Sequence, residues 1–191
     1  MSRRLEILRR AAEVFERKGV ARTSMEDIAN AVGIKREGVY YYFKSRGDIL
    51  LEVILPQSNS LLLNLQSILR SNISAKEKLH EAVRSHLDAF NPAYLEMSVA
   101  LREDHFVRDD AKLQELKKSW DDYSHGWVEL IAMGQQDGEF NTSLNPKMAA
   151  YGLLGMMNWV CRWYDPQGDV SIPEIIEQYT TMATTGLAGK S

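Results

Sequence analysis

The stretch from Thr23 to Lys44, TSMEDIANAVGIKREGVYYYFK, limits the possible folds of this chain more than any other part. Thr23 and Ser24 can each cap a helix start, and each has an acid three residues later, which is the spacing of a capping box. Gly33 can adopt the left-handed conformation that ends a helix. The stretch therefore predicts a short helix, a tight glycine turn, and a second helix over residues 34–43.

The two faces of the predicted second helix differ sharply. At about 100° per residue, Val39 and Phe43 share one face, whereas Arg36, Tyr40 and Lys44 line another. The first face is predicted to be core and the second exposed. Because phenol, guanidinium and ammonium groups donate hydrogen bonds to phosphate oxygens, the second face suits a recognition helix in a DNA major groove.

Three successive motifs carry a family resemblance: Thr-Ser-x-x-x-Ile-Ala, then Val-Gly-Ile, then Gly-Val-Tyr-Tyr-Tyr-Phe-Lys-Ser. Together they resemble the DNA-binding region of the TetR family of bacterial transcriptional regulators, over roughly the first quarter of the chain. The resemblance implies a homodimeric, all-helical, usually repressing protein whose DNA affinity is set by a small ligand in its larger C-terminal part. Glu37 and Tyr41 depart from the commonest pattern, which has a small residue and a histidine there, so no operator sequence is implied.

These motifs predict which residues contact DNA phosphates and which contact bases. We expect Thr23, Ser24, Tyr40, Tyr41 and Lys44 mainly to contact phosphates. The base readers are expected to be Lys35, Arg36 and Glu37. The partner is double-stranded operator DNA.

Charge is distributed unevenly along the chain. The net charge is -3, yet residues 1–52 carry 11 Lys+Arg and 8 Asp+Glu, a net of +3, so the remaining residues carry -6. A basic head on an acidic body fits a protein that meets phosphate at one end. No apolar run is long enough to span a membrane and no signal peptide is found, so we expect a cytoplasmic protein. The single cysteine, Cys161, cannot form an intrachain disulfide.

Helical periodicity extends along the whole chain, and the fold class predicted is all-α. We expect a three-helix helix-turn-helix head over residues 1–46 and a larger ligand-binding and dimerisation body over residues 47–191. A fourth helix should begin near Arg46 and kink or break at Pro56. The helices predicted from capping residues and periodicity cover residues 2–18, 59–70, 74–90, 92–102, 109–136, 145–164 and 171–185.

Aromatic and methionine side chains recur at helical spacing in the body, which is typical both of ordinary core and of an adaptable apolar pocket. Arg162 lies among apolar residues in sequence and is expected to be buried, so an anionic ligand group or an acid across a dimer interface is expected to pair with it. Its segment, residues 152–169, is similar to TetR members that sense acyl-CoA esters. The effector is therefore expected to be apolar or amphipathic, and the residues predicted to contact it are Phe90, Tyr94, Met97, Trp120, Tyr123, Trp127, Met156, Trp159 and Arg162.

The last two predicted helices offer an apolar face for dimerisation, which would place two heads on two half-sites of a pseudo-palindrome. The residues predicted at this interface are Tyr151, Leu154, Met157, Ile175, Ile176, Tyr179 and Met182.

Two other classes of function compete with this interpretation. Glu77-x-x-His80 and Asp122-x-x-His125 resemble the acid-x-x-His pairs of ferritin-like metal-binding bundles. An architectural DNA-binding protein without an effector would share the same head. No nucleophile elbow, phosphate-binding glycine loop or nucleotide fingerprint occurs, so neither an enzyme nor a cofactor is expected.

Overall fold

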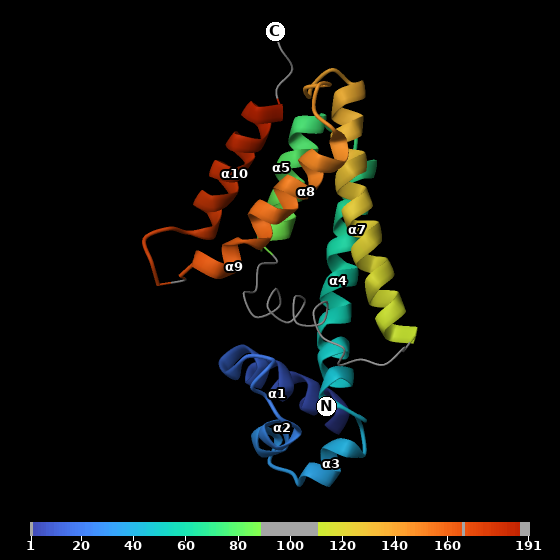
Figure 1. Ribbon diagram of the computed structural model, residues 1–191, viewed down its shortest axis with the longest axis vertical. Coiled ribbons are helices and arrows are strands. Elements are labelled where there is room, and N and C mark those ends of the chain that lie inside the picture. Colours follow the sequence, from blue (N-terminus) through green and yellow to red (C-terminus); the bar gives the residue numbers. More distant parts are fainter. Residues whose placement is uncertain (1, 89–110, 166, 188–191) are drawn as a thin grey trace. The chain divides into compact units, whose positions relative to one another are not determined.

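Helices joined by short turns make up the part of the chain that the structure describes. The computed structural model describes residues 2–88, 111–165 and 167–187 (Figure 1). The predicted all-α class is confirmed. The helices are α1 (Arg3–Lys18), α2 (Met25–Val32), α3 (Arg36–Tyr40), α4 (Arg46–Arg70), α5 (Ala75–Asp88), α7 (Ala111–Gln136), α8 (Pro146–Asn158), α9 (Val160–Trp163) and α10 (Ile172–Leu187).

The chain divides into two compact units, and α4 and α7 each contribute to both. Of the described residues, the first unit holds 2–59 and 111–117, and the second holds 60–88 and 118–187 except residue 166. The division is by contacts within the folded chain. The head and body boundaries at residues 46 and 47 are a functional division and stay a prediction.

The core of the first unit forms where α1 packs against α2, and α2 packs against α3. Ile7, Phe15, Ile28 and Val39 are each at most 2 % exposed. Burying one such side chain stabilises a fold by about 1.5–3 kcal/mol. These contacts fix the three short helices to one another, and α3 alone is too short to be stable in water.

The helix-turn-helix is set by local chemistry at both ends of α2. The Ser24 side chain accepts a hydrogen bond from the Asp27 backbone N–H, and the Asp27 carboxylate accepts one from the Ser24 N–H. Of the two capping boxes that the sequence allows, the structure therefore uses the one that starts at Ser24. Gly33 ends α2 with φ 74° and ψ 35°, which is the predicted left-handed cap.

Three helix boundaries differ from the predictions. α3 is shorter than residues 34–43, because after Tyr40 the chain tightens so that the Tyr42 N–H bonds to the Val39 carbonyl. α4 continues through Pro56, which removes one backbone donor, while buried leucines on both sides of it hold the helix. The predicted helix over residues 145–164 is interrupted at Trp159, where the Arg162 N–H bonds to the Trp159 carbonyl.

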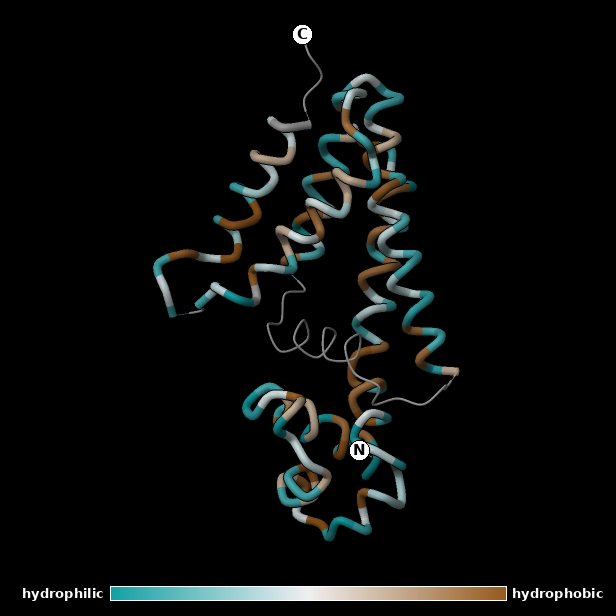
Figure 2. Tube along the Cα trace, in the orientation of Figure 1, coloured by the Kyte–Doolittle hydropathy of each residue, from teal (hydrophilic) through white to brown (hydrophobic). Residues whose placement is uncertain are grey.

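The second unit has a larger apolar core, formed by side chains from α4, α5, α7, α8 and α10. Leu79, Leu87, Trp127 and Met157 are completely buried in it. Figure 2 shows how hydrophobic residues recur along these helices between hydrophilic ones. The predicted starts at Ser74, Asn145 and Ser171 are confirmed, while the helix predicted over residues 92–102 lies outside the described residues.

Candidate nucleic-acid interface and effector site

An exposed polar face runs over α3 and the turn that follows it. Tyr40 is 42 % exposed and Tyr41 is 83 % exposed, and Lys35, Arg36 and Lys44 are also exposed. Val39 and Phe43, on the opposite side, are at most 2 % exposed. The predicted division of this segment into a core face and a polar face is therefore confirmed.

Two lysines on this face lack carboxylate partners of the kind that Arg9 and Arg10 have on α1. Arg9 and Arg10 both pair with Glu13, at 2.8 Å and 2.9 Å. In contrast, Lys35 and Lys44 form no ion pair with any residue that the structure describes. Solvated cations without partners are available to neutralise a polyanion.

Arg36 and Tyr40 hold each other in place on this face. The Arg36 guanidinium donates a hydrogen bond of 3.0 Å to the Tyr40 hydroxyl and lies 5.3 Å from the centre of its ring. Beside them, the rings of Tyr41 and Tyr42 meet edge to face at 4.9 Å. Such contacts limit the rotamers of the exposed side chains, which reduces the entropy lost when they bind a duplex.

Two residues predicted to contact phosphate have their hydroxyl groups engaged within the protein. Thr23 is 1 % exposed, and its hydroxyl donates 2.8 Å to the Gly19 carbonyl. The Ser24 hydroxyl belongs to the capping box and contacts Asp27. The prediction for Thr23 is corrected, because its buried hydroxyl is bound to the turn that follows α1. The Ser24 side chain caps α2 but is exposed, and its phosphate contact stays a prediction.

The role of Arg46 was not predicted from the sequence, yet its side chain connects two elements of the head. It begins α4, and its Nη1 donates to the carbonyls of Thr23 at 2.6 Å and Ala21 at 3.3 Å. A charged donor that satisfies two loop carbonyls fixes the connection between α1 and α2. Glu52, also on α4, pairs with Arg4 at 2.6 Å and with Lys112 of α7.

The residues predicted to contact an effector fall into three groups. Trp127 is fully buried, and Trp120, Tyr123 and Met156 are half-buried in the second unit. Trp159 is 63 % exposed and Arg162 is also exposed, so the expectation of a buried arginine is wrong. The reason is that Arg162 lies on the outer side of the short helix α9. The predicted contacts Phe90, Tyr94 and Met97 lie outside the described residues.

A buried histidine, which was also not predicted from the sequence, contacts aromatic residues of α7. His86 of α5 is 8 % exposed, and its Nδ1 lies 2.9 Å from the Tyr123 hydroxyl. Burial lowers the pKa of His86 from 6.5 to about 4, and a hydrogen bond with the Asn158 side chain partly opposes this shift. The imidazole is therefore neutral at pH 7.

The residues predicted at the dimer interface also divide by burial. Leu154, Met157, Ile175 and Ile176 are at most 8 % exposed and belong to the core of their own chain, and their place at an interface stays a prediction. Tyr179 is half-buried against the same core. Tyr151 and Met182 are 51 % and 59 % exposed. Other exposed apolar side chains on α8, α9 and the turn before α10 are Met148, Trp159, Trp163 and Val170.

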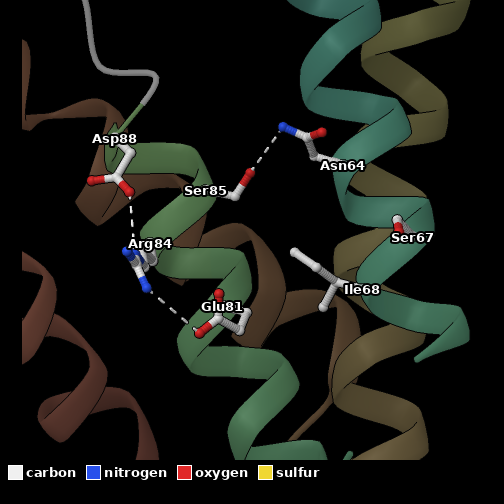
Figure 3. Close-up of a pocket in the computed structure, with 7 residues that line it drawn as sticks. All are labelled: Asn64, Ser67, Ile68, Glu81, Arg84, Ser85 and Asp88. Carbon is white, nitrogen blue, oxygen red and sulfur yellow. Dashed lines mark hydrogen bonds and ion pairs between the residues drawn. The ribbon is translucent and has the colours of Figure 1, made fainter. Parts of the chain in front are cut away.

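A groove of about 480 Å³ lies between α4 and α5 in the second unit (Figure 3). Its wall is polar, and Arg84 is already paired with Asp88 at 3.3 Å and with Glu81 at 4.0 Å. None of the residues predicted to contact an effector lines it. The lining residues are Asn64, Ser67, Ile68, Glu81, Arg84, Ser85 and Asp88.

The metal-binding alternative has no support in the described residues, which contain no group of three or more His, Cys, Asp or Glu side chains placed to hold an ion. The acids that suggested it have other roles. Glu77 completes a capping box with Ser74, and Asp122 pairs with Lys118 at 2.5 Å. Among the helices of the described chain, none has the length and apolar character needed to cross a membrane.

Comparison with known proteins gives two family matches that cover most of the chain. Residues 7–53 match the family of bacterial regulatory proteins called the tetR family, and residues 72–187 match the tetracyclin repressor-like C-terminal domain. The HTH-type transcriptional repressor KstR2 of Rhodococcus jostii (strain RHA1) is 27 % identical over an alignment of 190 positions, which covers 97 % of this chain and 91 % of that protein.

Solved structures show the same fold. The ketosteroid transcriptional regulator KstR2 of Mycobacterium tuberculosis superposes with a TM-score of 0.84 at 21 % identity, covering 99 % of this chain and 96 % of that one. The regulator AibR in complex with isovaleryl coenzyme A and operator DNA superposes with a TM-score of 0.79 at 19 % identity, covering 95 % and 97 %.

Proposed function

The chain belongs to the TetR family of bacterial regulatory proteins, and on that basis we propose that it binds a pseudo-palindromic operator as a homodimer and represses transcription until a small effector releases it. The observation that carries the proposal is the exposed face of α3, where Lys35 and Lys44 lack carboxylate partners among the described residues, whereas Arg9 and Arg10 of α1 both pair with Glu13. A repressor works where the chromosome is, so the proposal places the protein in the cytoplasm. It includes no catalytic activity and no cofactor.

Within this face, Tyr40, Tyr41 and Lys44 are assigned to phosphate contacts, and Lys35, Arg36 and Glu37 to base contacts. Tyrosine hydroxyls and lysine ammonium groups bind phosphate at any sequence, whereas a guanidinium can bond in pairs to the O6 and N7 atoms of guanine. The Tyr40 hydroxyl accepts a hydrogen bond from the Arg36 guanidinium, which leaves its own proton available to a phosphate oxygen.

The operator can be identified by selecting genomic fragments that the purified protein retains, and its affinity measured by fluorescence anisotropy. Arg36→Ala should change base preference at one position of each half-site, at a cost of about 1–3 kcal/mol for the preferred base. Tyr40→Phe should weaken binding to every sequence alike. A Tyr40→Phe protein with unchanged affinity would contradict the phosphate role of that hydroxyl.

For dimerisation, the proposal relies on the exposed apolar side chains of α8, α9 and α10. Tyr151 and Met182 are the predicted interface residues that remain exposed, and Trp159 and Trp163 add further apolar area. Association of two chains would bury this apolar patch and remove it from water, and for that reason the patch favours a dimer. Light scattering at micromolar concentration should give the mass of a dimer, and Tyr151→Glu should give a monomer.

The effector is proposed to be apolar or amphipathic, with an acyl-CoA ester as one class. AibR shows that this fold can hold an acyl-CoA and operator DNA together, and the KstR2 structure is of a ketosteroid regulator. An effector releases DNA only if it binds the non-operator conformation more tightly. A 100-fold release needs a difference of about 2.7 kcal/mol. An architectural protein without an effector would instead keep its operator affinity in the presence of such compounds.

A further inference from the structure

Two buried polar atoms on α7 lack hydrogen-bond partners in the described chain, and both belong to the second unit. Trp127 is 0 % exposed and Ser119 is 4 % exposed, yet neither the Trp127 Nε1 nor the Ser119 Oγ bonds to any described residue. A polar group buried without a partner costs about 1–3 kcal/mol. Groups of this kind in a native protein call for a specific explanation, such as a bound molecule that supplies the missing partner.

Trp127 belongs to a defined polar cluster, and Ser119 lies on the same side of α7 as this cluster. Ser119, Tyr123 and Trp127 follow one another at intervals of four residues, so they share one side of α7. His86 of α5 completes the group, with its ring centre 6.0 Å from that of Tyr123 and 6.4 Å from that of Trp127. The Tyr123 and Trp127 rings are themselves 6.3 Å apart.

Hydrogen bonding within the cluster determines what a ligand must offer. His86 is neutral and bonds to both Tyr123 and Asn158. A hydrogen bond from the imidazole N–H to the Asn158 amide oxygen leaves Nδ1 as the acceptor of the Tyr123 hydroxyl proton. The Trp127 indole can only donate, and the Ser119 hydroxyl can donate as well. What the cluster lacks is therefore an acceptor.

Among the described residues, no buried side chain of the second unit carries a charge that could pair with an anion at the cluster. In the described part of the second unit, the buried ionisable side chains are His86, which is neutral, and Lys78, whose Nζ donates 3.0 Å to the Leu69 carbonyl. The other buried neighbours are apolar, among them Leu79, Val83 and Leu130. A carboxylate brought here would lose its hydration without gaining a cation from the described residues, and burying an unpaired charge is far more costly than burying a carbonyl.

We propose that the Trp127 indole N–H and the Ser119 hydroxyl each donate to an uncharged oxygen of the effector, and that these two donors select carbonyl compounds with an apolar body over free carboxylic acids. The inference rests on the proposed function and adds the chemistry by which the effector is recognised. A thioester carbonyl and a ring ketone both supply such an oxygen.

Binding can be measured by calorimetry at pH 7.5 with decanoyl-CoA, androst-4-ene-3,17-dione and decanoate. At least one of the two carbonyl compounds should bind more tightly than decanoate. The compound that binds shows whether the effector carbonyl belongs to a thioester or to a ring ketone. Trp127→Phe and Ser119→Ala should each weaken its binding roughly 3- to 10-fold, the worth of one neutral hydrogen bond. Thr180→Val is the matched control, because it removes another buried hydroxyl without a partner in the described chain, located on α10.

Two further readouts separate a ligand contact from a structural role. Ser119→Ala should not lower the melting temperature, since it removes a hydroxyl that has no described partner. In protein labelled with ¹⁵N-tryptophan, the indole N–H signal of Trp127 is identified as the one absent from Trp127→Phe. This signal should move downfield when the carbonyl compound is added to the wild-type protein.

Preference for decanoate, or no binding of either carbonyl compound, would overturn the assignment. So would unchanged affinity in both α7 variants. A different result would contradict the proposed function alone: the carbonyl compound would bind through Trp127 and Ser119, but the affinity for the operator would not change when it is added.

Discussion

Replacing Lys44 with glutamine should weaken operator binding at every sequence and make it less sensitive to salt. Lys44 is exposed beside α3 and has no ion-pair partner in the described chain, so its charge is available to a phosphate. Each phosphate contact on B-DNA contributes about 0.9 to the slope of log affinity against log salt. A dimer presents two copies, so the slope should fall by about 2.

The loss of affinity follows from the same relation. At about 0.15 M salt, releasing the counterions of one phosphate contributes about 1 kcal/mol, so two contacts contribute about 2 kcal/mol. This corresponds to a roughly 30-fold higher Kd for the Lys44→Gln dimer. Fluorescence anisotropy over a salt series of 50–300 mM would measure both the slope and the affinity at each concentration.

Arg9→Gln is the matched control. It makes the same change in net charge, but Arg9 is on α1 and already paired with Glu13. Its slope should equal that of the wild type, and its affinity should change less than about twofold, because surface ion pairs contribute little. Equal effects of the two substitutions would refute the argument that unpartnered cations mark the DNA-binding face.

Three other predictions concern stability. Since the pKa of His86 is lowered to about 4, the unfolded chain binds more protons than the folded chain below pH 6.5. The free energy of unfolding, measured by urea titration, should therefore fall by about 2 kcal/mol between pH 7.5 and pH 5, and this loss should be absent in His86→Gln. Gly134→Ala would place a methyl carbon 2.2 Å from the Phe140 ring and should destabilise the protein by about 1–3 kcal/mol, whereas Gly152→Ala meets nothing within 4 Å and should not lower the melting temperature. Ser24→Ala removes a cap and should cost about 1 kcal/mol in chemical denaturation.

Features that depend on residues close in sequence were predictable. The cap at Ser24, the left-handed Gly33, and the starts of α5, α8 and α10 each rest on contacts within four residues. The same holds for the two faces of the α3 segment, because helical periodicity alone separates Val39 from Tyr40. Fold class and the position of the candidate DNA interface follow from these local features.

Features that depend on long-range packing could not be predicted. The bond between His86 and Tyr123 joins residues 37 positions apart, and nothing near either residue indicates the other. Arg162 has apolar neighbours in sequence but is exposed, because burial is decided by which side of a helix meets the core. For the same reason, apolar character could not separate Met157, which is buried, from Met182, which is exposed.

Crosslinking from a single position tests the central claim most directly. Tyr41, the most exposed tyrosine of the α3 face, can be replaced by the photoreactive p-benzoylphenylalanine, and the protein irradiated on its selected operator. The control carries the same group at Leu63, which is 64 % exposed in the second unit. We expect a covalent DNA adduct from position 41 and none from position 63. Retained operator binding with no adduct from position 41, or an adduct from position 63 alone, would contradict the assignment of α3 as the element that meets DNA.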